Sequence, residues 1–174
     1  MLLAAMAIAG SVVLVGCSND SDGQAVIDEA NAIPLTSTIN GEVPPGEPTL
    51  VHFSKEILNV MRDGQQVRVF RDVREPGTRA PIHVHPFGGW TCVVSGEAVL
   101  YLDGSEPQTT RAGECVNMPP LIPMSNVNPG SDPAVLLDSF VTPPNAPVWR
   151  IIEVGLTGLG DEFATDGHTK VNPQ

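Results

Sequence analysis

Short apolar runs separated by turn residues are the feature that most restricts what this chain can fold into. From about Thr49 onward the breaks carry Gly, Pro, Asn or Asp, as in Asp63-Gly64, Asp103-Gly104 and Asn128-Pro129-Gly130. Many short strands with such turns between them indicate an all-β sandwich or barrel. No long amphipathic helix is evident. The expected strands are 50–53, 57–61, 66–73, 82–85, 90–95, 98–102, 108–111, 114–118, 124–128, 134–141 and 148–154.

Two of the four histidines, His83 and His85, are separated by one residue. On an extended strand the side chains at i and i+2 point to the same face. Pro81 and Pro86 flank the pair, and a β-branched run follows at 91–94, so the region is expected to be strand and turn. Two imidazoles on one face can hold one metal ion or bracket one small ligand.

Length and charge exclude some functions. A chain of 174 residues suits one domain with a real core. The net charge is −11 and the basic residues are scattered, so no basic patch is available to neutralise phosphates. We therefore expect no nucleic-acid partner, and we interpret the acidity as a contribution to solubility.

Residues 1–16 are uncharged and nearly all apolar, and a polar segment begins after Cys17. The run is shorter than the roughly 20 residues of a membrane span and fits a secretory signal. Leu14-Val15-Gly16-Cys17 resembles the lipobox of bacterial lipoproteins, which places a small residue before an acylated cysteine. The resemblance implies lipidation of Cys17 and an extracytoplasmic, membrane-anchored protein of the cell envelope. The alternative is an ordinary signal peptide, which would give a secreted protein, or a hydrophobic anchor.

The segments flanking the strands are polar and rich in Gly and Pro. We interpret 1–16 as a signal peptide, 17–48 as a flexible tether with one or two helical turns at 25–32, and 49–154 as the β-domain. The run Gly41-Glu42-Val43-Pro44-Pro45 is a linker signal. Residues 155–174 are expected to form a loose polar tail.

Two cysteines besides Cys17 are present, Cys92 and Cys115. Outside the cytoplasm such a pair indicates a disulfide. The alternative is two buried thiols that pack as small hydrophobic side chains. From the residues alone both interpretations stay open.

The ordered motifs resemble those of the cupins, a family of small jelly-roll β-barrels. The first cupin motif is Gly, five residues, His-x-His, three or four residues, Glu, six residues, Gly. Gly77, His83, His85 and Gly96 match it, and Gly89 stands at the Glu position.

The second cupin motif is Gly, five residues, Pro-x-Gly, two residues, His, three residues, Asn. Gly113, Pro119 and Asn128 match it, whereas Leu121 replaces the second Gly and Met124 replaces the His. The resemblance covers about 49–154 and implies a cupin barrel in which two of the four family metal ligands are replaced.

The resemblance implies a site centred on His83 and His85, with Met124 in place of the third histidine. A thioether is a soft ligand that favours copper, and iron, zinc and manganese are the other metals expected. The alternatives are that Met124 only fills the core and that the site holds no metal.

Other residues near the motif are expected to contribute to a ligand pocket. Arg79 could bind a carboxylate, and Gly89 could admit a ligand where the glutamate side chain would stand. Strand alternation puts Thr91 on the same face as Gly89. Trp90, Cys92 and Val94 then lie on the outer face, where the resemblance implies a second sheet or a second subunit, hence a homodimer.

In the implied jelly-roll the strands of Cys92 and Cys115 are neighbours, which favours the disulfide. Three functions are consistent with these observations. The first is binding of a metal ion or small ligand at the cell envelope without turnover. The second is a metal-dependent enzyme of the dioxygenase or isomerase type, and the third is a barrel with a structural or interaction role. A fold alone does not choose among them.

Overall fold

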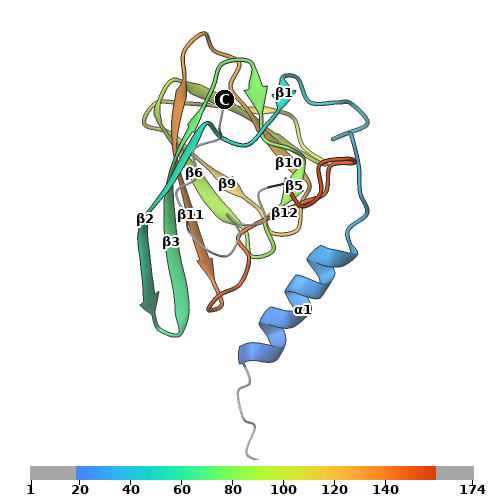
Figure 1. Cartoon of the computed structure of the whole chain (residues 1–174), viewed down its shortest axis with the longest axis vertical. Helices are drawn as coiled ribbons and strands as arrows, with labels where there is room; N and C mark the ends of the chain where they lie inside the picture. The colour runs from blue at the N-terminus through green and yellow to red at the C-terminus, as the bar shows by residue number, and fades with distance from the viewer. Residues whose placement is uncertain (1–18, 160–174) are drawn as a thin grey trace, which may run out of the picture.

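The computed structural model describes residues 19–159. This part of the chain forms one helix followed by twelve strands (Figure 1). The elements are α1 (Asn19–Ala32), β1 (Glu47–Pro48), β2 (Phe53–Arg62), β3 (Gln65–Arg74), β4 (Thr78–Arg79), β5 (His83–Val84), β6 (Gly89–Ser95), β7 (Glu97–Leu102), β8 (Gln108–Arg111), β9 (Cys115–Met118), β10 (Met124–Val127), β11 (Ala134–Thr142) and β12 (Arg150–Ile151).

The strands form two sheets that enclose one core. The order β2-β3-β11-β6-β9 builds a five-stranded antiparallel sheet. The other sheet has the order β1-β4-β10-β5-β12, with β7 joining β10 to β8. The predicted all-β jelly-roll barrel is confirmed.

The longest hairpin joins β2 to β3 and extends beyond the body of the barrel (Figure 1). Asp63 and Gly64 form its turn, with φ angles of 51° and 77°. Positive φ at both central residues is the geometry that matches the twist of paired strands, so the predicted turn at Asp63-Gly64 is confirmed. The expected strand 57–61 lies within β2, which has a register shift between Glu56 and Leu58, whereas only Phe53 of the expected strand 50–53 belongs to it.

Apolar side chains from both sheets meet in the core. Phe70 on β3 and Phe140 on β11 pack edge to face, with ring centroids 6.0 Å apart. The remaining members of this buried cluster are Leu100, Val116, Met118, Met124 and Val148. Alternate residues of the strands point into it, because successive side chains of a strand face opposite sides.

The outer face of the five-stranded sheet carries exposed apolar side chains. Trp90, Val94 and Val141 are each about half exposed, as the alternation in strand 90–95 indicates.

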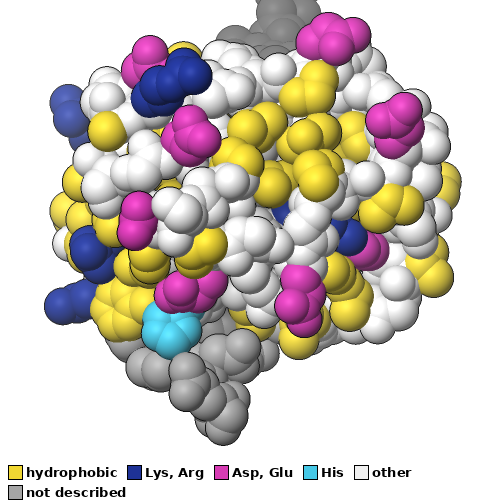
Figure 2. All heavy atoms as spheres, turned by 90° about the horizontal axis from the view of Figure 1, so that it is seen from above, with side chains coloured by type: hydrophobic (Ala, Val, Ile, Leu, Met, Phe, Trp, Pro, Cys, Tyr) yellow, Lys and Arg dark blue, Asp and Glu magenta, His cyan; other side chains and the backbone are white. Residues whose placement is uncertain are grey.

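On the face seen from above, hydrophobic side chains gather near the centre and acidic ones are scattered around them (Figure 2). Association of two copies stays a prediction.

Cys92 on β6 and Cys115 on β9 form a disulfide. The two residues are direct cross-strand partners, with Cα atoms 4.0 Å apart. The bond links the edge strand β9 to its neighbour β6. The third cysteine, Cys17, lies outside the described residues.

The segment before the barrel differs from the expected flexible tether. Residues 19–32 form the helix α1 rather than one or two turns, and Arg150 donates to its C-terminal carbonyls at Ala30 and Ile33. Ile39 is buried with Ala30 against Ile82, Val84 and Ile152 of the barrel. Removal of this apolar surface from water holds the segment in place.

No helix within residues 19–159 is long and apolar enough to cross a membrane. Residues 1–18, which include the expected signal peptide and Cys17, lie outside the described part of the chain, as do residues 160–174 of the expected tail.

Candidate functional site

The two histidines of the His-x-His motif lie side by side inside the barrel. His83 is on β5 and His85 follows this strand, and the two side chains are 5% and 4% exposed. Their Nε2 atoms are 3.2 Å apart. The residues on either side, Pro81 and Pro86, are also fully buried.

Each histidine ring uses its Nδ1 atom in a hydrogen bond to the backbone. Nδ1 of His83 lies 2.7 Å from the carbonyl oxygen of Pro81, and Nδ1 of His85 lies 2.5 Å from that of Val148. A carbonyl oxygen only accepts, so each Nδ1 carries the hydrogen and donates it. Burial lowers the pKa of His83 to about 3 and the pKa of His85 to about 4, so both rings are neutral at pH 7. The lone pairs of the two Nε2 atoms therefore face each other.

A metal ion shared by the two Nε2 atoms fits this geometry. Two imidazole nitrogens that bind one ion at about 2.1 Å can be at most about 4.2 Å apart, and the observed 3.2 Å satisfies this limit. Metal-binding histidines also usually donate their second nitrogen to a carbonyl or carboxylate, which orients the ring. Both histidines have this support.

Two methionines lie near the histidine pair. Met124 is the cross-strand partner of His83 and is fully buried. Met118, on β9, lines the same pocket. Sequence analysis did not select Met118, although alternation with Val116 places it on the inner face. Two thioethers beside two imidazoles form a soft donor set that suits Cu(I).

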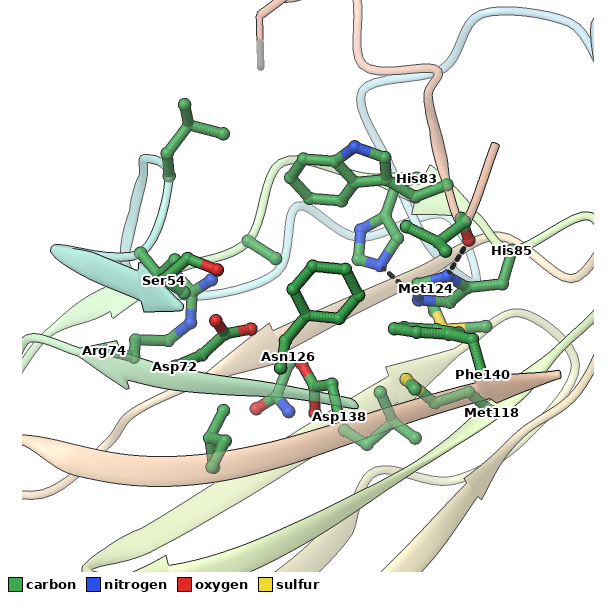
Figure 3. Close-up of a pocket in the computed structure, with 18 residues that line it drawn as sticks. Ser54, Asp72, Arg74, His83, His85, Met118, Met124, Asn126, Asp138 and Phe140 are labelled. Carbon is green, nitrogen blue, oxygen red and sulfur yellow. Dashed lines mark hydrogen bonds between the residues drawn. The ribbon is translucent and has the colours of Figure 1, made fainter. Parts of the chain in front are cut away.

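The histidines and methionines occupy one end of a pocket that continues between the two sheets (Figure 3). The pocket contains about 770 Å³ of space free of protein atoms, its open mouth included. Its opposite end carries Ser54, Asp72, Arg74, Asn126 and Asp138. The wall between the two ends is apolar and includes Phe70.

The polar end was not anticipated from the sequence. Asp72 and Asp138 stand at inward positions of β3 and β11, where alternation calls for apolar residues such as Phe70 and Leu136. A carboxylate at an inward strand position is the signal that could have identified them. Burial, together with the nearby Asp138 carboxylate, raises the pKa of Asp72, and burial raises the pKa of Asp138.

No group of three or more His, Cys, Asp or Glu side chains that could hold a metal ion occurs among residues 19–159. The side chains with metal-binding atoms that lie beside the histidine pair in the pocket are Met118 and Met124.

Comparison with protein families gives one match. Residues 70–147 match the cupin domain family. The match covers less than half of the chain, and it includes both histidines, both methionines and the two aspartates of the pocket. Together with the two-sheet barrel it supports the cupin superfamily. No curated protein shows significant similarity to the chain.

Several solved structures show partial similarity to this chain. A recombinant oxalate oxidase in complex with glycolate is 24% identical over 49% of this chain and 46% of its own, with a TM-score of 0.44. An oxalate decarboxylase from Lactobacillus farciminis is 19% identical over 49% of this chain and 31% of its own, with a TM-score of 0.40.

A cupin 2 conserved barrel domain protein from Salinispora arenicola is 21% identical over 49% of this chain and 71% of its own, with a TM-score of 0.43. The match spans less than half the length of the two oxalate enzymes. With TM-scores below 0.5, the activities of these proteins are not transferred to this chain.

Gly89 stands at the glutamate position of the cupin motif, and another side chain fills the space beside it. A Cβ atom at Gly89 would lie 2.7 Å from Cδ1 of Phe140 and 2.8 Å from the carbonyl oxygen of Ser139. The Phe140 ring also packs against His85, with ring centroids 4.9 Å apart. The expectation that Gly89 admits a ligand is therefore wrong: an apolar ring of the protein takes that place.

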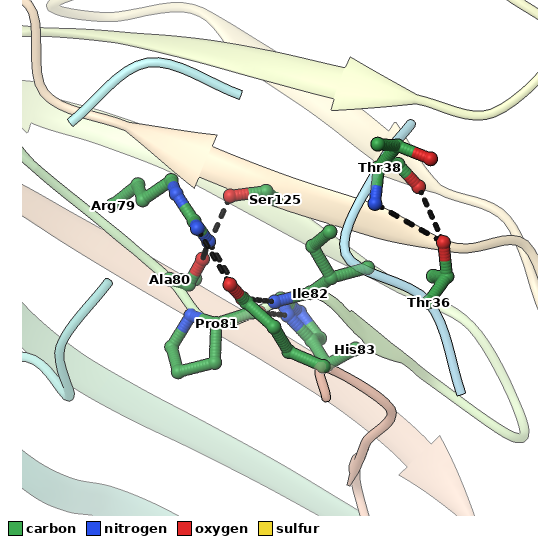
Figure 4. A network of polar contacts seen from close by, with 9 residues as sticks. Thr36, Thr38, Arg79, Ala80, Pro81, Ile82, His83 and Ser125 are labelled. Carbon is green, nitrogen blue, oxygen red and sulfur yellow. Dashed lines mark hydrogen bonds and ion pairs between the residues drawn. The ribbon is translucent and has the colours of Figure 1, made fainter. Parts of the chain in front are cut away.

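Arg79 is not in the pocket either (Figure 4). Its guanidinium forms a buried bidentate pair with Glu153, with N–O distances of 2.7 Å and 2.6 Å. Glu153 also accepts from the backbone N–H of Ile82, the residue before His83. Arg79 thus supports the strand that carries the histidines and is not free to bind a ligand carboxylate. Glu153 is 74 residues from Arg79 in the sequence, so no local pattern indicated that the two side chains pair.

Thr91 is buried and faces inward as expected, but it lies behind the pocket rather than in its lining. It is the cross-strand partner of Asp138. Burial raises the pKa of the Asp138 carboxyl, and the nearby Thr91 side chain acts in the opposite direction. Of the three expected pocket residues, Arg79, Gly89 and Thr91, none lines the pocket.

Proposed function

We propose that the barrel binds a transition-metal ion through Nε2 of His83 and Nε2 of His85, with Met124 as the next donor. The observation that carries the proposal is the 3.2 Å approach of two nitrogens whose hydrogens are both on Nδ1. A cation between them removes the repulsion of the two lone pairs. Copper, as Cu(I), is the metal that the thioethers of Met118 and Met124 favour.

A bound ion would supply Lewis-acid or redox chemistry to a small ligand in the pocket. His83 and His85 would hold it and their carbonyl partners would keep the rings oriented. We propose the role of a metal- or ligand-binding barrel rather than a particular reaction. The metal-dependent enzyme is the second candidate, and the carboxyl groups at the far end of the same pocket are the observation that favours it.

The test is titration of the chelator-treated full chain with Cu(I) under a competing chromophoric ligand, and with Zn²⁺ and Mn²⁺ by calorimetry. We expect one equivalent of copper. His83→Ala combined with His85→Ala is expected to weaken binding by about 100-fold or more, since even supporting residues of metal sites contribute about 10- to 100-fold. Met124→Leu is expected to weaken Cu(I) binding and to leave Zn²⁺ binding unchanged, because zinc prefers nitrogen and thiolate donors.

His52→Ala is the matched control, since His52 lies outside the pocket lining. It should bind copper as the parent protein does. Undiminished binding by the double histidine variant would show that the metal is held elsewhere, and the absence of binding by any of the three metals would remove the proposal.

We further propose that the protein is lipid-anchored at Cys17 on the extracytoplasmic side of a membrane. The support is the lipobox-like run before Cys17 and the polar segment after it. Cys17→Ser is expected to move the protein from the membrane fraction to the soluble fraction of the cell envelope, measured by fractionation and immunoblot. Cys92→Ser, which leaves Cys17 in place, is the control. Membrane attachment of the Cys17→Ser variant would contradict this proposal.

A further inference from the structure

The polar end of the pocket contains two carboxyl groups on neighbouring strands. In the register of β3 and β11, Asp72 is paired with Leu136 and Asp138 with Phe70, so the two aspartates are diagonal neighbours on the inner face. The Asp138 carboxylate is close enough to help raise the pKa of Asp72, and Ser54 on β2 is the cross-strand partner of Asp72. Figure 3 shows Ser54 and Asp72 at the end of the pocket away from the histidines, with Asp138 between Asp72 and Met118.

Several polar atoms of this group are buried without a partner in the described part of the chain. They are Oδ1 of Asp72, Oδ1 of Asp138, Oδ1 of Asn126 and Nε of Arg74. Buried polar atoms are nearly always hydrogen-bonded, so each exception calls for an explanation. Asn126 is 9% exposed and is on β10, in the opposite sheet from the two aspartates. Both sheets therefore contribute an unpaired acceptor to this end of the pocket.

The unpaired atoms define what a ligand must supply. Three of the four are oxygens that can accept, so the ligand should donate several hydrogen bonds from one group. Arg74 faces the two carboxylates without forming an ion pair with either of them within residues 19–159. Burial raises the pKa of both carboxyl groups, and a bound cation would favour their charged forms. With both ionised, they and the guanidinium of Arg74 leave a net charge of −1, which one monovalent cation balances.

An ammonium group has both properties, since it carries one positive charge and three N–H donors. A divalent ion would overcompensate the charge beside the guanidinium of Arg74, and calcium takes six to eight oxygen ligands. A carboxylate or phosphate ligand would be repelled by the two aspartates. A neutral alcohol supplies one donor and no charge.

The rest of the pocket specifies the other part of the ligand. Leu50, Val51, Phe70 and Leu136 contribute apolar surface to the pocket, and Trp149 packs against His83 at its other end. Burial of a hydrocarbon body against them is favourable by roughly 25 cal/mol per Å². We propose that this end of the pocket binds the ammonium group of a small primary amine, with Asp72, Asp138 and Asn126 as acceptors and the apolar wall around its hydrocarbon part.

This site is distinct from the metal site, because its acceptors, Asp72, Asn126 and Asp138, are none of the proposed metal ligands, although Asn126 and Met124 share β10. The two sites share one pocket, so an amine held by the aspartates would extend toward His83 and His85. The amine proposal does not require that a metal is bound.

The test uses the full chain in the presence of a chelator, so that an amine cannot bind through a metal ion. The probes are butylammonium, hexylammonium and benzylammonium, each compared with the alcohol and the carboxylate of the same hydrocarbon group. Thermal denaturation and calorimetry are the measurements. We expect at least one ammonium probe to raise the Tm and to bind, with the matching alcohol weaker by about 10- to 100-fold and the carboxylate without effect.

Asp72→Asn combined with Asp138→Asn keeps the size of both side chains and removes the charge. It is expected to weaken binding of the ammonium probe by about 10- to 100-fold while binding of the alcohol changes little. Asn126→Ala is expected to weaken binding of the ammonium probe to a smaller extent. His83→Ala with His85→Ala, which removes the proposed metal ligands, should retain amine binding, so the two proposals fail separately.

Several results would overturn the inference. These are no binding by any of the three ammonium probes, equal binding of ammonium and carboxylate probes, or undiminished ammonium binding by the folded double aspartate variant. Circular dichroism and the Tm of each variant establish that it is folded. Loss of amine binding in the double histidine variant would place the ammonium group at the other end of the pocket and would also contradict the assignment.

Discussion

Between pH 7 and about pH 5 the metal-free protein is expected to lose about 2 kcal/mol of unfolding free energy for each of His83 and His85. The pKa of both rings is lowered in the folded state, to about 3 and about 4, from the ordinary value of 6.5. Burial is the main cause, and for His83 the neighbouring His85 ring adds to it.

The direction follows from proton binding. Below pH 6.5 the unfolded chain takes up protons at both histidines and the folded protein does not, so the stability is full above pH 6.5 and falls as the pH is lowered. The pKa values of Asp72 and Asp138 are raised, so those groups act in the opposite direction and favour the folded state on acidification. A comparison of variants separates the two contributions.

His83→Asn combined with His85→Asn is the matched variant. Asparagine has an amide N–H near the position of Nδ1, and it does not titrate. Urea unfolding at several pH values, with chelator present, should give a stability that falls with acidification for the parent protein and falls less for the variant. Equal slopes for the two proteins would contradict the interpretation that the histidines are buried and neutral.

Glu153→Gln is expected to lower the free energy of unfolding by about 3–5 kcal/mol, because it leaves the buried guanidinium of Arg79 without a counter-charge. The two side chains are 8% and 3% exposed, and their closest N–O distance is 2.6 Å. Burial alone would raise the pKa of Glu153, but the hydrogen bonds from Arg79 and Ile82 and the charge of Arg79 together outweigh it, so the pKa is lowered. Urea unfolding at pH 7 measures the effect.

Glu97→Gln is the control, because it breaks a surface pair with Arg111 at 4.0 Å. That variant should stay within about 0.5 kcal/mol of the parent protein. The double variant Arg79→Met with Glu153→Met should lose less unfolding free energy than Glu153→Gln alone, since it leaves no buried charge without a partner. An equal loss in Glu153→Gln and Glu97→Gln would show that the buried pair does not stabilise the fold as described.

Glu153→Gln also has a functional readout. Its carboxylate accepts the N–H of Ile82, and β12 pairs with β5, which carries His83. A shift of this strand would change the distance between the two Nε2 atoms, so copper affinity is expected to fall together with stability, whereas Glu97→Gln should not change it.

The sequence predicted what depends on local alternation. The spacing of His83 and His85 places both rings on one side of an extended segment, and Asp63-Gly64 has the residues that a tight hairpin turn requires. Both features need only neighbouring residues. The inward position of Met124 followed from comparison with a family motif rather than from alternation.

Features that depend on strand register were not predictable in this way. Phe140 fills the space beside Gly89 only because β11 pairs with β6. The pairing of Arg79 with Glu153 and the meeting of Asp72 with Asp138 join residues more than 60 positions apart. The polar composition of 33–48 indicated a linker, although Ile33 and Ile39 pack against the barrel and the backbone of Thr36 is hydrogen-bonded to it.

The contact between the start and the end of the described chain has a consequence for the order of folding. The backbone N–H of Thr36 donates to Ile152, and the N–H of Val154 donates to Thr36. These partners are more than 110 residues apart, and closing so long a loop is slow relative to local pairing. Chains are made from the N-terminus, so the contacts of α1 and Thr36 with residues 150–154 cannot form until the end of the barrel has emerged, whereas β1 can pair with β4 much earlier. During synthesis or export, α1 and the residues directly after it therefore remain undocked until then, and they complete the fold last.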